Sequence, residues 1–316
     1  MKKIKLGISS CLLGKKVRYN GTHKLEPYLK FRLGKYIEWL PVCPELEAGL
    51  PVPREAMNLC GQLKSPGLLG VKSQRDYTPL IKEFIHQKIA QLKNEGLWGF
   101  VFKSKSPSCG LTGVQIYNGP LASYAKTEGL FAKAFRQHFP FLPLTDEKRL
   151  NNILARENFI LCLAVLVHWQ KALSAKKPAQ ALALFHRQHK LILIACDRKT
   201  WQVLNQLQRR TQSKDITQVY QAYQQKMLEA LQKGFATPSH LHVLSFISKY
   251  LKRFLQPYER QRLTKAIHLY AQGNASLKDL SQIIKAYAQK YQQPWLLEQN
   301  YLKIPTQEWT YAWNRA

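Results

Sequence analysis

Three short apolar runs in the first half of the chain each lead to a cysteine in a turn-rich segment, and this pattern constrains the fold most. The cysteines are Cys11, Cys43 and Cys109. The runs alternate with segments of helical periodicity, which is typical of a mostly parallel α/β sheet. Because the carboxyl ends of parallel strands meet at one edge of the sheet, the three cysteines are predicted to lie together.

The periodicity predicts two domains of different classes. In residues 1–147, strands are predicted at 4–8, 36–42 and 98–103, and helices at 78–95 and 127–138. This first domain is expected to be α/β and Rossmann-like. Residues 148–316 have few glycines and are expected to form an all-α domain. Its predicted helices are 153–173, 179–195, 201–209, 216–233, 239–255, 259–270 and 276–291.

Three clustered cysteines favour a metal site over three separate core residues. Taken singly, each thiol would be expected in the core, since free cysteine is among the most buried residue types. Their spacing matches no zinc-finger pattern. Three thiolates are one fewer than the four that close an iron–sulfur cube, which would leave one iron open for a substrate. Cys60 is a reserve fourth ligand, whereas Cys162 and Cys196 lie in apolar helical segments and are expected in the core.

The charge balance favours a polyanionic partner. The chain has 48 Lys and Arg against 19 Asp and Glu, a net charge of +29. The net charge is +11 for residues 1–147 and +18 for residues 148–316. Binding to nucleic acid explains such an excess of positive charge better than solubility alone. No apolar stretch approaches the ~20 residues of a membrane span. We expect a cytoplasmic protein with reduced thiols, and the sequence indicates no membrane and no protein partner.

Several polar residues are candidates for chemistry or binding, each with a plainer alternative. Glu45 follows Cys43 closely and could act as a general base on water, or merely stabilise a helix start. Ser106 and Ser108 could donate to a substrate or an anion, although ordinary turn chemistry is the alternative and is favoured for Ser108. Arg18 and Arg54 lie in turns and could hold a phosphate or pair with an acid.

Basic residues of the second half are candidates for RNA contact. His186 and His189 are three apart on a predicted helix, and a basic RNA-facing surface is favoured there over a metal site. A second segment interleaves aromatic and cationic residues, which suits phosphate contact with stacking but also an ordinary amphipathic helix. The candidate RNA-binding residues are His186, Arg187, His189, Lys190, Lys252 and Arg253.

Five motifs of the first half together resemble the thiouracil desulfidase family. They are Ser10-Cys11-Leu12-Leu13-Gly14, Val17-Arg18-Tyr19-Asn20-Gly21, Cys43-Pro44-Glu45, Gly49-Leu50-Pro51-Val52-Pro53-Arg54 and Ser106-Pro107-Ser108-Cys109-Gly110. The resemblance covers roughly residues 3–147. Residues 184–310 resemble a helical domain often fused to this family. The fused arrangement is similar to bacterial desulfidases that remove sulfur from 4-thiouridine in tRNA.

The resemblance implies a [4Fe-4S] cluster bound by Cys11, Cys43 and Cys109, whose fourth iron binds the sulfur of a thiolated base. Glu45 and Ser106 match the positions with catalytic roles. Our hypothesis is hydrolytic cleavage of the carbon–sulfur bond, in which Glu45 activates water and Ser106 donates or relays a proton. The partner would be tRNA. The alternatives are a desulfidase of free thiouracil, and a non-catalytic iron–sulfur or zinc protein that binds nucleic acid or senses redox state.

Overall fold

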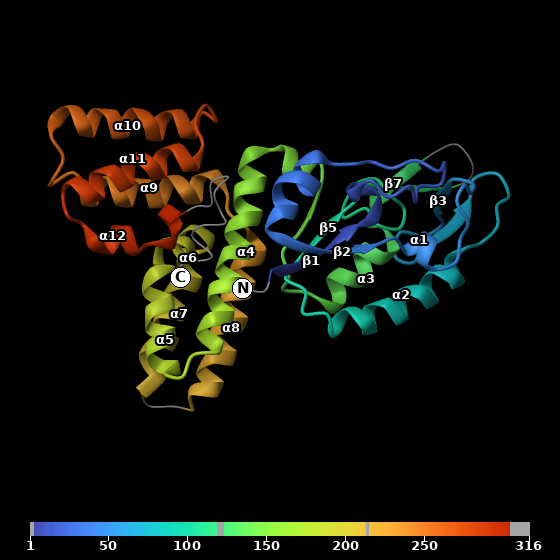
Figure 1. Cartoon of the computed structure of the whole chain (residues 1–316), viewed down its shortest axis with the longest axis horizontal. Helices are drawn as coiled ribbons and strands as arrows, with labels where there is room; N and C mark the ends of the chain where they lie inside the picture. The colour runs from blue at the N-terminus through green and yellow to red at the C-terminus, as the bar shows by residue number, and fades with distance from the viewer. Residues whose placement is uncertain (1–2, 119–122, 213–214, 304–316) are drawn as a thin grey trace. The chain divides into compact units, whose positions relative to one another are not determined.

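The computed structural model describes residues 3–118, 123–212 and 215–303. The described chain divides into two compact units, one ending at Asn152 and the other starting at Ile153. The first unit combines strands and helices, and the second is helical (Figure 1). The prediction of an α/β domain followed by a helical domain is therefore confirmed.

A four-stranded parallel sheet forms the centre of the first unit. Its strands are β1 (Ile4–Ser9), β2 (Ile37–Val42), β5 (Phe100–Phe102) and β8 (Leu144–Asp146). Their order is β2-β1-β5-β8, and every neighbouring pair is parallel. The predicted mostly parallel sheet is thus confirmed, and the carboxyl ends of β2, β1 and β5 lie next to one another.

A second sheet of four short strands was not predicted from the sequence. Its strands are β3 (Met57–Cys60), β4 (Gly67–Gly70), β6 (Val114–Tyr117) and β7 (Ser123–Thr127), in the order β4-β3-β6-β7. The pair β3–β6 is parallel, and the two outer pairs are antiparallel hairpins. Strands of four or five residues are too short for their alternation to stand out from a loop.

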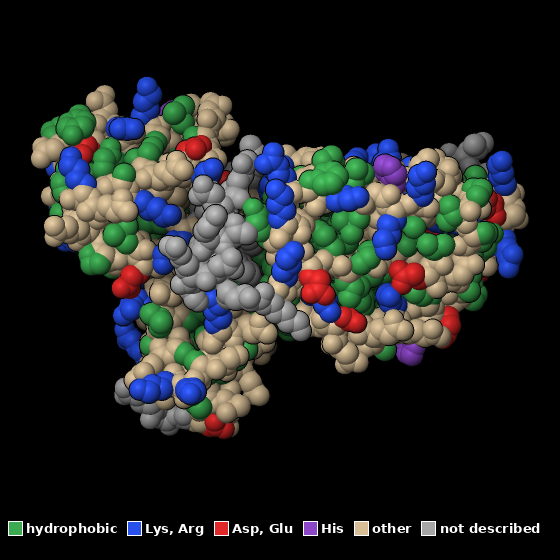
Figure 2. Space-filling view, viewed as in Figure 1, with side chains coloured by type: hydrophobic (Ala, Val, Ile, Leu, Met, Phe, Trp, Pro, Cys, Tyr) green, Lys and Arg blue, Asp and Glu red, His purple; other side chains and the backbone are tan. Residues whose placement is uncertain are grey.

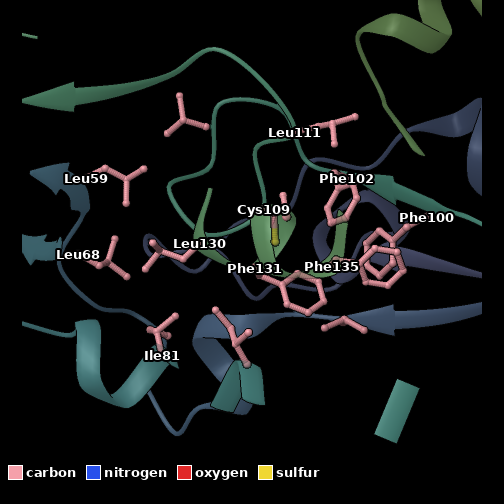
Figure 3. Packing of buried hydrophobic residues seen from close by; sticks show 14 of the residues in the cluster. Leu59, Leu68, Ile81, Phe100, Phe102, Cys109, Leu111, Leu130, Phe131 and Phe135 are labelled. Atoms are coloured by element: carbon pink, nitrogen blue, oxygen red, sulfur yellow. The ribbon is translucent and has the colours of Figure 1, made fainter. Parts of the chain in front are cut away.

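Helices α2 (Thr78–Lys93) and α3 (Leu130–His138) lie side by side against this unit's core (Figure 1). Helix α2 buries one face, formed by Ile81, Ile85, Ile89 and Leu92. The core is rich in aromatic rings: Phe100, Phe102, Phe131 and Phe135 are all fully buried and in mutual ring contact. Cys109 belongs to the same apolar cluster (Figure 3).

Glycine is required at one position beside this core. A Cβ atom at Gly7, in the middle of β1, would lie 2.1 Å from the Phe100 ring. The absence of a side chain at Gly7 therefore lets a phenylalanine of the neighbouring strand pack across β1.

The second unit consists of helices over its described residues. They are α4 (Ile153–Leu173), α5 (Pro178–Gln188), α6 (Lys190–Cys196), α7 (Arg198–Arg209), α8 (Ile216–Lys233), α9 (Thr237–Leu251), α10 (Pro257–Ala271), α11 (Leu277–Lys290) and α12 (Pro294–Glu298). The predicted helix 179–195 is two helices that meet at His189. Among the described helices, none has the length and apolar character needed to cross a membrane.

Candidate active site

The three cysteines lie at the carboxyl ends of three adjacent strands. Cys11 is in the short helix Ser10–Leu13 that follows β1, Cys43 separates β2 from α1 (Pro44–Glu47), and Cys109 is in the loop after β5. Because β2, β1 and β5 are parallel neighbours, all three residues reach the same edge of the sheet. They line a single cavity of about 300 Å³. The structure therefore brings together the three residues predicted as ligands.

Cys11 and Cys109 are buried, Cys43 is partly buried, and the charge of each thiol affects the others. Burial raises the pKa of Cys11 to about 11 and the pKa of Cys109 well above its ordinary value. Negative charge on Cys43 would raise both of these pKa values further, and Lys103 acts in the opposite direction on Cys11. Thiols in such a place stay protonated until a cation compensates the charge of the thiolates, which is what a bound metal centre does.

The donor set fits a cluster better than a single ion. Within the described ranges, no group of three or more His, Cys, Asp and Glu side chains is close enough to hold one metal ion. In a cube, each of three irons takes its own thiolate, so the ligands stand further apart than the ligands of one zinc ion. Cys11, Cys43 and Cys109 match this arrangement, because they come from three different strands around a shared cavity.

The remaining cysteines do not join this set. Cys60 lies on β3, is not among the residues that line the cavity, and its thiol approaches the Asn58 carbonyl oxygen at 3.8 Å. Cys162 and Cys196 are buried within α4 and α6. The expectation that these last two belong to the core is confirmed.

Glu45 reaches the same cavity from α1 with its carboxylate held on both oxygens. Its Oε1 accepts a hydrogen bond of 2.6 Å from the Ser108 hydroxyl. Its Oε2 accepts one of 3.1 Å from Arg54 Nε and also pairs with Arg54 Nη2. The guanidinium on one oxygen and the hydroxyl on the other together fix the plane of the carboxylate. The structure thus presents one oriented carboxylate beside the cysteines.

The Arg54 guanidinium hydrogen-bonds to groups of the protein itself. Besides holding Glu45, it donates to the carbonyl oxygens of Pro51 and Val17, at 3.2 and 3.1 Å. Arg18 also lines the cavity, donates to Thr22 Oγ1 at 2.8 Å, and lies over the Tyr19 ring. Phosphate contact by either arginine stays a prediction.

The position of Ser108 contradicts its predicted role in substrate or phosphate binding. Its side chain is fully buried, and it is not among the residues that line the cavity. The loop that carries it packs against the start of α3, where the N–H groups of Leu130 and Phe131 donate to the carbonyl oxygens of Pro107 and Ser108. This packing turns the Ser108 hydroxyl inward to Glu45, so Ser108 is a positioning residue.

Ser106 lines the cavity as predicted. Its Oγ accepts a hydrogen bond of 3.1 Å from the Cys109 N–H. Because the hydroxyl oxygen acts there as an acceptor, its own hydrogen can be donated to another group. The structure therefore leaves Ser106 able to donate into the cavity.

A partly buried ion pair at the cavity was not predicted from the sequence. Lys103 lines the cavity, and its Nζ lies 2.6 Å from Glu147 Oε1. The N–H and hydroxyl of Ser104 also donate to Glu147, at 2.8 and 2.5 Å. Burial raises the pKa of Glu147, but the hydrogen bonds from Lys103 and Ser104 outweigh it, and the pKa is lowered overall. Lys103 directly follows β5, so the strand-end argument that located the cysteines would also have located this lysine.

The two histidines predicted to face RNA are instead in the core of the helical unit. His186 and His189 are both buried. His186 Nδ1 lies 2.9 Å from the Tyr223 hydroxyl, and His189 lies between the Phe185 carbonyl and the ring of His168. Burial lowers the pKa of His186 to about 4 and of His189 to about 3, so both are neutral at pH 7. Their predicted side-chain contact with RNA is therefore wrong.

The four basic candidates of this unit are partly or fully exposed. Arg187 is exposed and pairs with Glu298 at 3.1 Å. Lys252 and Arg253 are also exposed, and the Arg253 guanidinium lies over the rings of Tyr250 and Phe254. Lys190 is partly exposed, and its Nζ lies 5.6–5.9 Å from the ring centres of Trp201, Phe246 and Trp295. RNA contact by these four residues stays a prediction.

Taken together, the fold and the site define a class: an α/β protein with a three-cysteine cavity at the carboxyl edge of a parallel sheet, joined to a helical domain. Residues 6–147 match the model of the 2-thiouracil desulfurase family, and residues 190–305 match a model described as a protein of unknown function, DUF1722. A relative, the uncharacterized protein YbbK of Bacillus subtilis (strain 168), is 32% identical over 153 residues, which are 46% of this chain and 98% of the relative. The chain belongs to the 2-thiouracil desulfurase family.

A solved structure is also similar to this half of the chain. It is the [4Fe-4S]-dependent thiouracil desulfidase TudS, at 30% identity and a TM-score of 0.39, and the match covers 47% of this chain and 94% of that protein. The predicted resemblance to thiouracil desulfidases is confirmed by the family match. The resemblance to desulfidases that act on tRNA stays a prediction.

Proposed function

We propose that this protein is a desulfidase that converts 4-thiouridine in tRNA to uridine and hydrogen sulfide, using a [4Fe-4S] cluster held by Cys11, Cys43 and Cys109. The observation that carries the proposal is that these three cysteines and the oriented carboxylate of Glu45 line one cavity in a member of the thiouracil desulfurase family. The reaction exchanges the thiocarbonyl sulfur for the oxygen of water and releases hydrogen sulfide. Atoms balance and no net electrons are transferred.

Each residue around the cavity has a separate task in this proposal. When bound, the cluster supplies an iron with an open position, which polarises the thiocarbonyl as a Lewis acid. Glu45, fixed by Ser108 and Arg54, takes the proton from the attacking water at its carboxylate. Ser106 donates its free hydroxyl hydrogen as the carbon–sulfur bond breaks. The Lys103 ammonium, anchored by Glu147, offsets the negative charge of the thiolates.

The charge of the chain supports RNA as the carrier of the thiolated base. The second half has a net charge of +18. On the face drawn in Figure 2, Lys and Arg side chains are spread over both units and Asp and Glu are sparse. Lys252 and Arg253 are exposed, and Arg253 lies over the rings of Tyr250 and Phe254, which suits a phosphate contact next to base stacking. Free thiouracil is the second candidate substrate, because it gives the matched family its name.

The test is anaerobic turnover with a defined substrate. The protein is reconstituted with iron and sulfide and mixed with 4-thiouridine-containing tRNA, while the near-ultraviolet band of the thiocarbonyl and the released sulfide are followed. We expect the band to disappear with stoichiometric sulfide in the wild type and in a Cys60→Ala control, and to persist in Cys109→Ala. A persistent band in wild-type protein with an intact cluster and bound tRNA would instead support a non-catalytic binding or sensing protein. A parallel arm with free 2-thiouracil distinguishes the two substrates.

A further inference from the structure

The positive charge of the first unit is concentrated in one short segment. Residues 15–35 (the basic segment) contain seven of the 22 Lys and Arg residues of positions 1–147, but one of the 11 Asp and Glu residues, Glu26. The net charge of the basic segment is therefore +6, against +5 for the rest of that half. Charge that serves solubility needs no such segregation, so the segment indicates an anionic partner. Its seven basic residues are Lys15, Lys16, Arg18, Lys24, Lys30, Arg32 and Lys35.

These charges are open to solvent and are not neutralised locally. Arg18 is partly exposed and the other six side chains are exposed. In the described part of the chain, none of the seven has a carboxylate oxygen within 4.0 Å, whereas Lys5, Lys88 and Lys103 of the same unit each pair with a glutamate. Figure 2 shows Lys and Arg side chains over the short helices that Figure 1 draws in blue.

The backbone fixes the basic segment to the turn that carries Cys11. The N–H of Lys24 donates to the Cys11 carbonyl oxygen at 3.0 Å, and the N–H of Glu26 donates to the Leu12 carbonyl oxygen at 2.9 Å. A Cβ atom at Gly14 would lie 3.6 Å from Lys30 Nζ, so the Lys30 ammonium stands beside the same turn. Because Lys24 also lines the cysteine-lined cavity, the segment begins at the rim of that cavity and leads away from it.

The second half of the segment places cations around an exposed aromatic ring. It forms two short helical turns, Tyr28–Arg32 and Leu33–Lys35, which bury Leu29 and Leu33. Phe31 points the other way and is 54% exposed. The Lys30 Nζ lies 5.5 Å from the centre of the Phe31 ring. An exposed ring among cations suits a nucleobase stacked on the ring with phosphates beside it.

The proposed reaction creates a need for such a surface. A base in a folded RNA must leave its stack before its thiocarbonyl can enter a cavity. The neighbouring bases then lack a stacking partner, and their phosphates lie near the rim of the cavity. An exposed aromatic ring can replace the lost stacking partner, and unpaired lysines can neutralise the flanking phosphates.

We propose that the basic segment is an RNA-binding surface of the first unit, which holds the nucleotides next to the thiolated one by stacking on Phe31 and by phosphate contacts with Lys30 and Lys35. This inference rests on the proposed desulfidase function. It adds a contact surface outside the cavity, on the unit that carries the cysteines, so RNA binding does not depend on the helical unit alone.

The experiment compares Lys30→Glu/Lys35→Glu with the wild type and with Lys82→Glu/Lys93→Glu. Lys82 and Lys93 are exposed lysines of α2 that do not line the cysteine-lined cavity, so the control makes the same change of charge elsewhere in the unit. Binding of unmodified tRNA to the reconstituted full chain is measured by fluorescence anisotropy at several salt concentrations.

For Lys30→Glu/Lys35→Glu, we expect Kd at low salt to rise about five- to thirtyfold, as for two exposed charge contacts. The slope of log affinity against log salt should become shallower by about 2, roughly one for each lost phosphate contact. The Lys82→Glu/Lys93→Glu control should keep the wild-type slope.

A second variant tests the aromatic ring separately. Phe31→Ala leaves every charge in place, so it should weaken tRNA binding about five- to hundredfold without changing the salt slope. With thiolated tRNA as substrate, KM should rise in both variants while kcat changes little. The kcat/KM for the free nucleoside 4-thiouridine should stay at the wild-type value, because a nucleoside has no neighbouring nucleotides to hold.

The outcomes separate this inference from the proposed function. Wild-type affinity and slope in Lys30→Glu/Lys35→Glu, or an equal loss in the α2 control, would overturn the RNA-binding surface and leave the desulfidase intact. If the wild type binds tRNA through this surface but releases sulfide from neither thiolated substrate, the proposed function is wrong and the surface stands.

Discussion

Replacing Ser108 by alanine should weaken both the fold and the reaction, because this hydroxyl is one of two anchors of Glu45. The hydrogen bond is 2.6 Å long, goes to a charged acceptor, and comes from a fully buried side chain. Hydrogen bonds to charged groups contribute about 1.5–3 kcal/mol. Since Glu45 borders a cavity from which water can reach the oxygen that the substitution frees, we expect the lower part of this range, about 1.5–2 kcal/mol. If the lost orientation has the same effect on the transition state, kcat falls by roughly ten- to thirtyfold.

The assay pairs urea unfolding of the protein with turnover of the reconstituted enzyme. Ser106→Ala is the matched control, because Ser106 lies in the same loop but accepts only a neutral backbone hydrogen bond, worth ~0.5–1.5 kcal/mol. Ser106→Ala should therefore lower kcat with a smaller loss of stability, while Ser108→Ala lowers both. If Ser108→Ala matches the wild type in unfolding free energy and in kcat, the assignment of Ser108 as an anchor of the carboxylate is refuted.

Three further predictions concern other parts of the chain. Burial lowers the pKa of His240 to about 4, against ~6.5 when unfolded, so the unfolded chain binds more protons between these values. The contribution of neutral His240 to the unfolding free energy of the helical unit should be fully present above about pH 6.5 and should fall by on the order of 2 kcal/mol by pH 5. Unfolding curves that do not change with pH would contradict this. Lys103→Met should lower the unfolding free energy by about 1.5–3 kcal/mol, because Glu147 loses its charged partner and keeps only the hydrogen bonds from Ser104, and a second change, Glu147→Leu, should restore much of that loss in thermal unfolding. Arg253→Glu should weaken tRNA binding and flatten its dependence on salt, as seen by titration at several salt concentrations; an unchanged slope would exclude a phosphate contact.

The cysteine site was predictable because it follows from the topology of the sheet. Each of Cys11, Cys43 and Cys109 comes after an apolar run, and parallel strands bring such positions to one edge. Lys103 satisfies the same rule but was overlooked, since a lysine after a strand is ordinary on a protein surface. Its partner Glu147 is distant in sequence, so only the folded chain reveals the pair.

The roles of Ser108 and His186 show what a sequence pattern leaves open. The turn around Ser108 was recognised, but the direction of its hydroxyl depends on how α3 packs against the loop. The spacing of His186 and His189 places them near one another on a helical path, but spacing does not say which face is buried. Both histidines point into the core, where the Tyr223 hydroxyl contacts His186 Nδ1 and the Phe185 carbonyl oxygen contacts His189 Nδ1.

The order of the strands also bears on how the protein matures. Cys11 follows the strand between those that lead to Cys43 and Cys109, so its two partners come from either side of it. A nascent chain that has passed Cys43 already contains two of the three thiols, but the β5 side of the sheet does not yet exist. The pocket is complete only after the loop with Cys109 has docked against α3, which begins at Leu130. Iron and sulfide delivered earlier would meet an unfinished ligand set, so loading of the centre belongs after the first unit has folded.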